Sequence, residues 1–569
     1  MLPSLDVEKV KKEILDSQIW RSMFRGGVWK DTPRDRASHI IGNVWLHLHP
    51  VRARPRALEW TYTWGLGGIS FVLFLILTVT GVLLMFYYRP TIDLAYRDMK
   101  DLEFAITLGK LFRNMHRWAA QAMVVAVIAH MVRVFLTGSY KKPREFNWGV
   151  GVLLLTLTLF LSFTGYLLPW DQLAIWAVTV GTNMAAASPG LGNEGPFGSL
   201  MGMRINNDIR FVLLGGTMVG ENTLLRFYVM HCVAVPLLVG ILLIVHFWRV
   251  RKDSFSAAPY NSAEEKLEVW PHLVKREYIA AAGCLLFIML WSILMDAPLE
   301  VQANPNVTPN PSKAPWYFVG LQELLVYFDP WIAGVILPNL IIVGLMALPY
   351  IDTNPKGVGY YTWKERPFAN AQFMLGVVLW FVLIYIGYYC RGPNFFWYWP
   401  WESWLDPKPA PPPTWSVFGP VIPNCAWPGQ PAAAGQPPCD SLFPIWMGLP
   451  LVGLAFAASM ALPKMIKAEI ESKKAHIAFF AVMILAVAAG KLLGKMTLLQ
   501  GGWLLFFGYL HFYFGFLLPQ RHIRNLDWAR YLVTMFLVIC TTGVLLKMCA
   551  RLAFDIKYLI TIPQISMNI

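Results

Sequence analysis

The chain has 569 residues, of which 56% are hydrophobic and only 14% are charged, and its formal net charge is +14. A soluble protein carries roughly 25% charged residues, so the composition excludes a string of soluble domains and predicts a polytopic membrane protein. An excess of Lys and Arg is typical of the cytoplasmic loops of such proteins, so we do not expect nucleic acid as a partner. The seven cysteines form no CxxC or CxxCH pattern, which excludes a zinc ribbon and a standard c-type haem attachment.

Residues 1–60 form a charged segment before the first long apolar stretch. Charges from Asp6 to Asp16 interrupt any hydrophobic region, so the sequence predicts no secretory signal peptide. We expect this segment to lie on the cytoplasmic surface of the membrane.

Apolar stretches long enough to cross about 30 Å of hydrocarbon occur eleven times. Because each stretch is continuously apolar rather than alternating, the pattern predicts helices and not a β-barrel. The stretches cover about 66–88, 115–136, 148–168, 227–248, 278–296, 331–350, 369–390, 443–462, 477–494, 501–518 and 528–548.

A basic cluster follows every even-numbered stretch. The clusters contain Lys141, Lys142 and Arg144; Arg249, Arg251 and Lys252; Lys356, Lys364 and Arg366; Lys464, Lys467, Lys473 and Lys474; and Arg521 and Arg524. Such clusters mark the cytoplasmic, electrically negative (n) side. The N-terminus is therefore predicted on the n side, and the C-terminus on the opposite, positive (p) side.

Residues 391–442 are rich in Pro and Trp and interrupt the series of apolar stretches. We interpret them as an ordered p-side loop between two membrane units. Cys425 and Cys439 lie fourteen residues apart in this loop, and an oxidising p-side compartment would permit a disulfide between them.

Four histidines lie within apolar stretches at a shared spacing. His116 and His130 are fourteen residues apart in the second stretch, and His231 and His246 are fifteen apart in the fourth. In a helix these spacings place each pair on one face, about 21–22 Å apart along the axis. A single intramembrane His more often makes a hydrogen bond, but two matched pairs favour axial ligation of two haem irons. Since both stretches run in one direction, His116 is expected to pair with His231 near the p side, and His130 with His246 near the n side.

Glycines on the first and third stretches share this spacing: Gly67 and Gly81, and Gly151 and Gly165. Glycine allows a helix backbone to approach a flat macrocycle closely, although ordinary small-residue helix packing is the alternative. Arg113 and Arg117 flank His116 and are candidates to neutralise haem propionates; the alternative is that they reach to the membrane interface.

Several strings resemble the cytochrome b/b6 subunit of quinol:cytochrome c (or plastocyanin) reductases. They are Phe86-Tyr-Tyr-Arg-Pro-Thr91, His116-Arg-Trp118, Leu136-Thr-Gly-Ser-Tyr-Lys-Lys-Pro-Arg-Glu145, Thr164-Gly-Tyr-Leu-Leu-Pro-Trp-Asp-Gln172, and Thr223-Leu-Leu-Arg-Phe-Tyr228, which leads into His231. Residues 61–255 resemble cytochrome b6, and residues 270–390 resemble its three-helix partner, subunit IV. The resemblance implies an all-α integral membrane protein with a four-helix di-haem bundle and a subunit-IV-like unit in one chain. About four further helices, in residues 443–569, match neither.

The resemblance implies the cytochrome b subunit of a quinol-oxidising Rieske/cytochrome b complex in the bacterial inner membrane. In that family, quinol is oxidised near the p side, and two b haems carry electrons to an n-side quinone site, with coupled proton translocation. The implied partners are a Rieske iron–sulfur protein, c-type cytochrome subunits, quinone and a second copy of the complex in a homodimer.

The family's p-side quinol pocket lies between the loops that follow the third and fifth stretches. Here that implicates Tyr166, Pro169, Trp170, Trp176, Trp316 and Tyr317. Aromatic walls suit a quinone ring, although each aromatic residue is also compatible with the interfacial belt of a membrane protein.

Two departures from the family pattern bear on function. Gly65 stands where cytochrome b6 has the Cys that holds an extra haem, so we expect no covalent extra haem. The family's Pro-Glu-Trp-Tyr motif reads Ala314-Pro315-Trp316-Tyr317, so the carboxylate expected to accept a quinol proton is missing.

The nearby carboxylates are Asp296, Glu300 and Glu323. Glu323 follows Trp316 by seven residues in an apolar stretch, where desolvation would raise a carboxyl pKa, so we predict it as the substitute proton acceptor. A carboxylate that is merely hydrogen-bonded at a helix end is the alternative, and Asp296 is expected to be better hydrated.

Two other functions fit part of the pattern. A di-haem membrane anchor of a dehydrogenase also binds two haems and quinone, but usually has four or five spans. A transporter is compatible with eleven spans and with intramembrane His residues. His511, in the tenth stretch, is interpreted as a packing histidine.

Overall fold

The structure is a computed structural model that describes residues 6–23, 31–44, 46–409, 414–419, 441–466, 471–492, 494 and 496–569. Among these residues, eleven helical spans are long and apolar enough to cross a membrane. Each coincides with one of the predicted stretches, so the predicted number and place of the spans are confirmed. Cys425 and Cys439 lie outside the described residues.

Short elements precede the first span. They are α1 (Val7–Asp16), α2 (Gln18–Met23), α3 (Pro33–Gly42), the 3-10 turn η1 (Leu46–Leu48), β1 (Arg52–Ala53), α4 (Pro55–Leu58) and α5 (Trp60–Thr63). Strand β1 pairs antiparallel with β2 (Leu267–Glu268), which fastens this segment to the start of the fifth span. We call this end of the bundle the β1–β2 side.

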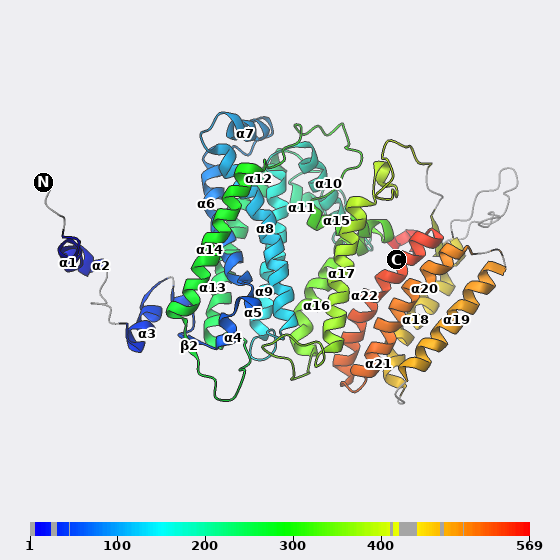
Figure 1. Cartoon of the computed structure of the whole chain (residues 1–569). Coiled ribbons are helices and arrows are strands. Elements are labelled where there is room, and N and C mark those ends of the chain that lie inside the picture. The colour runs from blue at the N-terminus through cyan, green and yellow to red at the C-terminus, as the bar shows by residue number, and fades with distance from the viewer. Residues whose placement is uncertain are drawn as a thin grey trace.

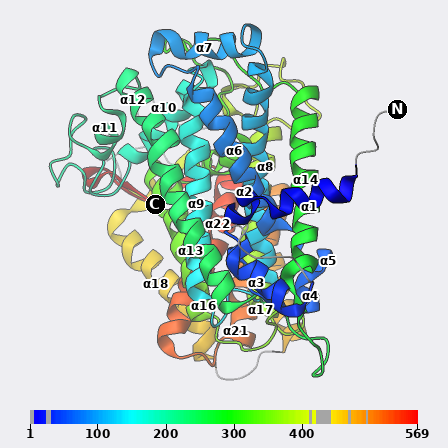
Figure 2. The same cartoon turned by 90° about the vertical axis from the view of Figure 1, so that its left-hand side faces the viewer.

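The first four spans form one bundle (Figure 1). They are α6 (Leu66–Met85), α8 (Gly109–Leu136), α9 (Glu145–Leu167), and the continuous helix of α12 (Glu221–Val229), η2 (Met230–Ala234) and α13 (Val235–Asp253). Helix α6 packs on α8, and α9 packs on α13. Helix α7 (Ile92–Phe104) lies across the opposite end of the bundle from α4 and α5 (Figure 2), and we call that end the α7 side. On this side, α10 (Gln172–Ala186) and α11 (Ile209–Leu214) belong to the connection between α9 and α12.

Three spans and one shorter helix follow. They are α14 (Val269–Leu294), α15 (Trp316–Tyr327), the helix of η3 (Trp331–Ile336) and α16 (Leu337–Ile351), and α17 (Pro367–Tyr389). Helix α14 packs against α6 and α8, whereas α15 packs against α17, and α16 packs against α9. Residues 297–315 connect α14 to α15 on the α7 side.

The C-terminal spans stand beside α16 and α17 (Figure 1). They are α18 (Ile445–Met465), α19 (Ser472–Leu492), the helix of α20 (Leu498–Phe512), η5 (Tyr513–Leu517) and α21 (Leu518–His522), and α22 (Trp528–Phe554). Helix α22 supplies the contacts of this unit with α15 and α16.

A small sheet, which the sequence analysis did not predict, accompanies the C-terminal unit. Its order is β4 (Ser441–Pro444), β3 (Trp415–Gly419), β5 (Ile556–Ile562), β6 (Met567–Asn568). The final residues then return to the subunit-IV-like unit: the indole of Trp331 donates to the Asn568 carbonyl at 2.8 Å, and the Asn568 amide donates to Asp329 at 2.8 Å. Strands β3 and β5 pair although they are more than a hundred residues apart in the sequence, which no local pattern reveals.

Three spans contain a short π-helix, and a proline follows each one by two residues. The segments are η2 before Pro236, η3 before Pro338 and η5 before Pro519. Proline has no backbone N–H, so the regular hydrogen-bond ladder cannot continue through it. A π-bulge takes up one extra residue at such a point and shifts the register of every residue that follows.

Candidate haem and quinol sites

Two histidines face each other between α8 and the α12–α13 helix near the α7 side. The ring centres of His116 and His231 are 6.2 Å apart, and their planes make an angle of 78°. Nδ1 of His116 lies 2.9 Å from Thr80 Oγ1, and Nδ1 of His231 lies 3.1 Å from the Leu161 carbonyl. These contacts fix each ring through one nitrogen, so the other nitrogen remains available to a metal.

Each of these rings rests on a glycine of the adjacent helix. A β-carbon added to Gly81 would lie 3.2 Å from the His116 ring, and one added to Gly165 would lie 2.4 Å from the His231 ring. The second distance is far below van der Waals contact, so Gly165 is required for the observed place of His231. The threonines that meet the rings directly precede these glycines, as Thr80 precedes Gly81 and Thr164 precedes Gly165.

A second pair lies deeper in the bundle, toward the β1–β2 side. His130 and His246 are close enough to interact electrostatically. A β-carbon added to Gly67 would lie 3.3 Å from the His130 ring, and one added to Gly151 would lie 3.7 Å from the His246 ring. No threonine precedes these two glycines, and Nδ1 of His130 is buried without a hydrogen-bond partner among the described residues.

The unequal histidine spacings are reconciled by the π-helix. A spacing of fifteen residues in a regular α-helix would rotate His246 by about 60° from His231. His231 lies within η2, where the N–H of Val235 bonds to the carbonyl of Met230. The wider π turn takes up the extra residue. His231 and His246 can therefore face His116 and His130, which are only fourteen residues apart on α8.

The separation of His116 and His231 is compatible with two imidazoles that would bind one haem iron. Two imidazoles that bind one metal from opposite faces, at about 2 Å each, have ring centres about 6 Å apart, which is the separation of His116 and His231. The described residues contain no group of three or more His, Cys, Asp or Glu able to hold an ion. A bis-histidine haem needs two protein ligands only, and the four glycines clear space beside them.

The two arginines near His116 point to different neighbours. The Arg113 guanidinium donates to the carbonyls of Ala297 and Pro298, at 3.0 Å each, and is therefore used to hold the loop after α14. The Arg117 guanidinium lies 4.8 Å from the centre of the Tyr166 ring. A propionate role for either arginine stays a prediction.

Aromatic side chains from two distant segments meet near Arg117. Tyr166, at the end of α9, and Tyr317, at the start of α15, both interact electrostatically with Arg117. The Trp316 indole donates to Gln121 Oε1 of α8 at 2.6 Å, and the Trp316 and Tyr317 rings make an edge contact at 5.5 Å. The structure thus brings Tyr166, Trp316 and Tyr317 together, and it adds Gln121, which the sequence analysis missed.

Two regions of the chain, one with the four-helix bundle and one with α15–α17, match known protein families. Residues 52–254 match the family model described as Cytochrome b/b6/petB, and residues 302–402 match the model described as Cytochrome b(C-terminal)/b6/petD. The cytochrome b6 of Porphyra purpurea is 42% identical over 191 residues, which cover 34% of this chain and 82% of that protein.

The chain belongs to the cytochrome b/b6 family.

Two further matches extend over a larger part of the chain. The cytochrome b/c1 of Bradyrhizobium diazoefficiens is 31% identical over 344 residues, which cover 59% of this chain and 47% of that protein. A solved structure titled "Hyperthermophilic respiratory Complex III" shares the fold with a TM-score of 0.51 at 22% identity, and the match covers 67% of this chain and 91% of that one. The matched family regions end at residue 402, so the spans α18–α22 lie outside them.

The remaining predicted aromatics of this cytochrome b serve the loops of the α7 side. Trp170 is buried, and its carbonyl accepts from Ala303 at 3.1 Å, whereas the Trp176 indole donates to the Val307 carbonyl at 2.9 Å. Pro169 lies in the same turn. These residues fasten the loop 297–315, which leads into Trp316, to the turn after α9 and to α10.

Asp171 and Gln172 complete this connection and were not predicted as functional. One Asp171 oxygen accepts from the Ala174 amide at 2.9 Å and the other from the Glu300 amide at 3.2 Å. Burial raises the pKa of the Asp171 carboxyl. The Gln172 amide exchanges hydrogen bonds with the backbone of Asn304, at 2.6 and 3.1 Å. The string from Thr164 to Gln172 therefore begins with a residue that contacts His231 and ends with two residues that hold the loop after α14.

Glu323 is fully buried and already has strong partners. Arg391 donates to its two oxygens at 3.0 and 2.7 Å, and the Tyr327 hydroxyl donates at 2.6 Å. Helix α15 is formed as expected, but the carboxylate is not a free acceptor in an apolar stretch. The structure favours the structural alternative, in which Glu323 ties α15 to the end of α17.

The other two candidate carboxylates, Asp296 and Glu300, are exposed. Asp296 is exposed, as expected, and forms an ion pair with Lys110 at 2.8 Å. The hydrogen bond from Lys110 lowers the pKa of Asp296, which makes it a weaker proton acceptor. Glu300 contributes its backbone, because its carbonyl accepts from the Tyr96 hydroxyl at 2.9 Å.

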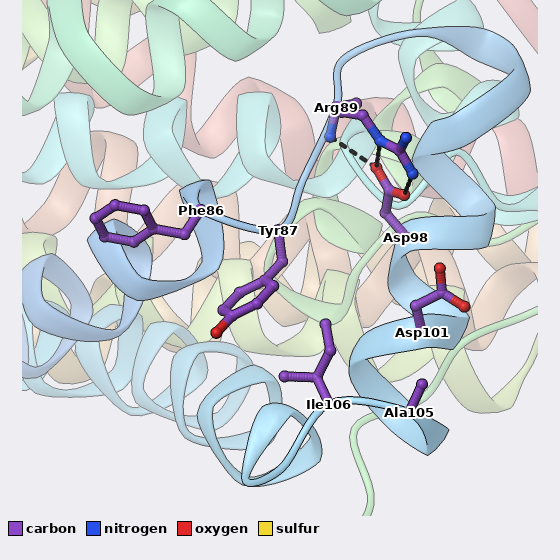
Figure 3. Close-up of a pocket in the computed structure, with 7 residues that line it drawn as sticks. All are labelled: Phe86, Tyr87, Arg89, Asp98, Asp101, Ala105 and Ile106. Carbon is purple, nitrogen blue, oxygen red and sulfur yellow. Dashed lines mark hydrogen bonds and ion pairs between the residues drawn. The ribbon is translucent and has the colours of Figure 1, made fainter.

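A polar pocket lies on the α7 side, between the end of α6 and α7 (Figure 3), and Tyr166, Trp316 and Tyr317 are not among its lining residues. The backbone N–H of Arg89 donates to Asp98 at 2.8 Å, and its guanidinium binds the same carboxylate. This contact holds the segment that begins at Phe86, after α6, against helix α7.

Gly65 is unsuited to a cysteine in this fold. Its φ angle is +61°, and an added β-carbon would lie 2.8 Å from the Trp60 ring. The absence of a covalent extra haem at this position stays a prediction.

The first prediction concerns the fit between Gly165 and His231. A Gly165→Ala substitution should displace the His231 ring, because the new methyl group overlaps it. We expect purified protein to bind about one haem b per chain instead of two, measured by the pyridine haemochrome assay. Gly149→Ala, on the same helix with its nearest atom 3.9 Å away, is the control and should retain both haems. Two haems in Gly165→Ala would contradict the assignment.

The second prediction concerns the buried pair of Glu323 and Arg391. Removing one partner of a buried ion pair costs roughly 3–5 kcal/mol, so Glu323→Gln and Arg391→Gln should each lower the thermal stability of the purified protein. The double variant should lose less thermal stability than the sum of the two single losses, because no unpaired charge remains.

The pH dependence of quinol oxidation separates this role from proton transfer. A structural pair predicts the same pH profile in wild type and Glu323→Gln. A profile that changes in Glu323→Gln but not in Arg391→Gln would restore Glu323 as the proton acceptor.

Proposed function

We propose that this chain is the cytochrome b subunit of a Rieske/cytochrome b complex that oxidises quinol. The observation that carries the proposal is the pair of facing histidines, His116 and His231, at 6.2 Å between ring centres, together with the deeper pair on the same two helices. Family membership supports the same function. Neither a dehydrogenase anchor nor a transporter accounts for both matched cytochrome b regions.

In this proposal each part of the site has a role. His116 and His231 hold the p-side haem b, and His130 and His246 hold the n-side haem b. When bound, the two haems supply one-electron carriers between a p-side quinol site and an n-side quinone site. Tyr166, Trp316 and Tyr317 would form walls for the quinol ring, and the hydrogen bond from Trp316 to Gln121 orients one of these walls relative to the helix of His116.

The α7 side corresponds to the p side in this proposal, and the β1–β2 side to the n side. The basic clusters after the even-numbered spans support this orientation in a bacterial inner membrane, with a cytoplasmic N-terminus. The proposed units are a cytoplasmic segment 1–60, a di-haem domain 61–255, a subunit-IV-like domain 270–390, a p-side loop 391–442 and additional helices 443–569. Quinol oxidation on one side and quinone reduction on the other would couple electron transfer to proton translocation.

The proposed partners follow from the chemistry of quinol oxidation. The p-side site delivers electrons one at a time, which requires an acceptor for the first electron. A Rieske iron–sulfur protein, followed by a c-type cytochrome subunit, would fill this role, and the complex would be a homodimer. The relatives titled cytochrome b/c1 and Complex III support such an assembly.

Purification in mild detergent tests the assembly directly. We expect a Rieske protein and a c-type cytochrome to co-purify with the chain, and the complex to show two b-type haems and quinol oxidation. A purified complex that holds a dehydrogenase flavoprotein in place of the Rieske protein would overturn the proposal in favour of the anchor.

The third prediction separates the four ligands. His116→Ala or His231→Ala should remove the p-side haem, and His130→Ala or His246→Ala the n-side haem, each measured in redox-titrated absorbance spectra. His511→Ala is the control, because we assign His511 of α20 to packing, and it should leave both signals unchanged. Full retention of both b-type signals in His231→Ala would overturn the ligand assignment.

A further inference from the structure

A partly open apolar cavity lies between the cytochrome b core and the C-terminal helices. Its volume is about 670 Å³, within the range of small-ligand sites in proteins. Helices α8, α9, α15, α16 and α17 line one part, and α22 with the end of α21 lines the rest. Helices α16 and α22 meet at one edge, where a β-carbon added to Gly344 would lie 3.1 Å from Leu537. The C-terminal unit therefore supplies a wall that the matched family regions do not contain.

The body of the cavity is apolar, and one end is polar. Its middle is lined by side chains such as Leu155, Leu345, Leu379 and Val544. The polar end lies on the β1–β2 side, where Asp352, Asn354, Glu365 and Arg366 enter the lining. A ligand that matches these walls has a long apolar part and one polar head.

Arg366 gives this polar end an unused hydrogen-bond donor. The residue is 1% exposed, and one terminal nitrogen donates to the Phe135 carbonyl at 2.8 Å while the other donates to the Tyr140 hydroxyl at 2.7 Å. Its Nε is buried and has no hydrogen-bond partner in the described part of the chain. A buried donor without a partner is costly, so an acceptor oxygen from a ligand would stabilise this end.

The nearby carboxylates do not take this place. Asp352 accepts from Tyr140 and forms an ion pair with Lys141 at 3.1 Å, and it lies 3.8 Å from the nearest Arg366 nitrogen. Glu365 accepts from the Tyr360 hydroxyl. The polar end thus offers a guanidinium N–H to an incoming oxygen.

We propose that this cavity binds one glycerophospholipid, with an acyl chain between α9 and α22 and its phosphate toward Arg366. Arg366 directly precedes the first residue of α17, so the donor lies at the end of a span, at the depth of lipid head groups rather than in the hydrocarbon. Guanidinium groups bind phosphate oxygens strongly. The lipid would fill the space between the core and the C-terminal unit, beside the contacts made by α22, by α21 with α17 and by the C-terminal tail.

Filling the cavity from two opposite walls tests the proposal. We expect the purified wild-type complex, washed in mild detergent, to retain one tightly bound phospholipid per chain, counted by mass spectrometry of the extracted lipids. Leu155→Trp on α9 and Thr541→Trp on α22 should each reduce this count to none while both haem spectra stay intact. Val533→Trp is the matched control, because Val533 is nearly the size of Thr541 but is 46% exposed on the outer face of α22, and it should retain the lipid.

Each other outcome overturns the proposal. Wild-type complex without such a lipid, or Trp variants that keep it, would exclude a lipid in this cavity. Release of a quinone instead of a phospholipid from the cavity-filling variants would replace the proposed ligand. If neither Trp variant assembles, a density map of the wild-type complex decides: a head group beside Arg366 supports the lipid, and an empty cavity or a quinone ring there refutes it.

Discussion

The contact between a histidine ring and a glycine of the adjacent helix governs the rest of this structure. Four such contacts occur at two levels, and the tightest places an imidazole where even one methyl group at Gly165 would overlap it. Because the rings lie against bare backbone, α6 can pack directly on α8, and α9 on α13. The threonines before Gly81 and Gly165 then orient the two rings nearer the α7 side.

The loops of the α7 side depend on that bundle for their place. Arg113, which lies on the same helix as His116, holds the start of the loop after α14. Asp171 and Gln172 hold the following residues of that loop. This loop delivers Trp316 and Tyr317 to Tyr166, so the aromatic site is built from two separate helices, α9 and α15. The buried pair of Glu323 and Arg391 fixes the other end of α15, which explains why a carboxylate in this apolar helix does not need to be a proton acceptor.

The C-terminal helices add a second layer beside the first seven spans. Their main contact is α22, and the returning tail meets Asp329 and Trp331 at the start of the sixth span. A unit attached in this way leaves space along the core, and the cavity that ends at Arg366 is the result. The prolines after each π-helix show how these long spans change register without breaking.

Local pattern in the sequence determined the eleven spans, the histidine and glycine spacings and the family, because hydropathy and helical periodicity are properties of neighbouring residues. Tertiary structure alone decided which groups meet across the chain. Glu323 and its partner Arg391 are 68 residues apart, and Trp316 and Gln121 are 195 apart. The π-helix at His231 is an intermediate case: Pro236 is visible in the sequence, but the choice between a kink and a wider turn depends on the packing that holds the histidine opposite its partner.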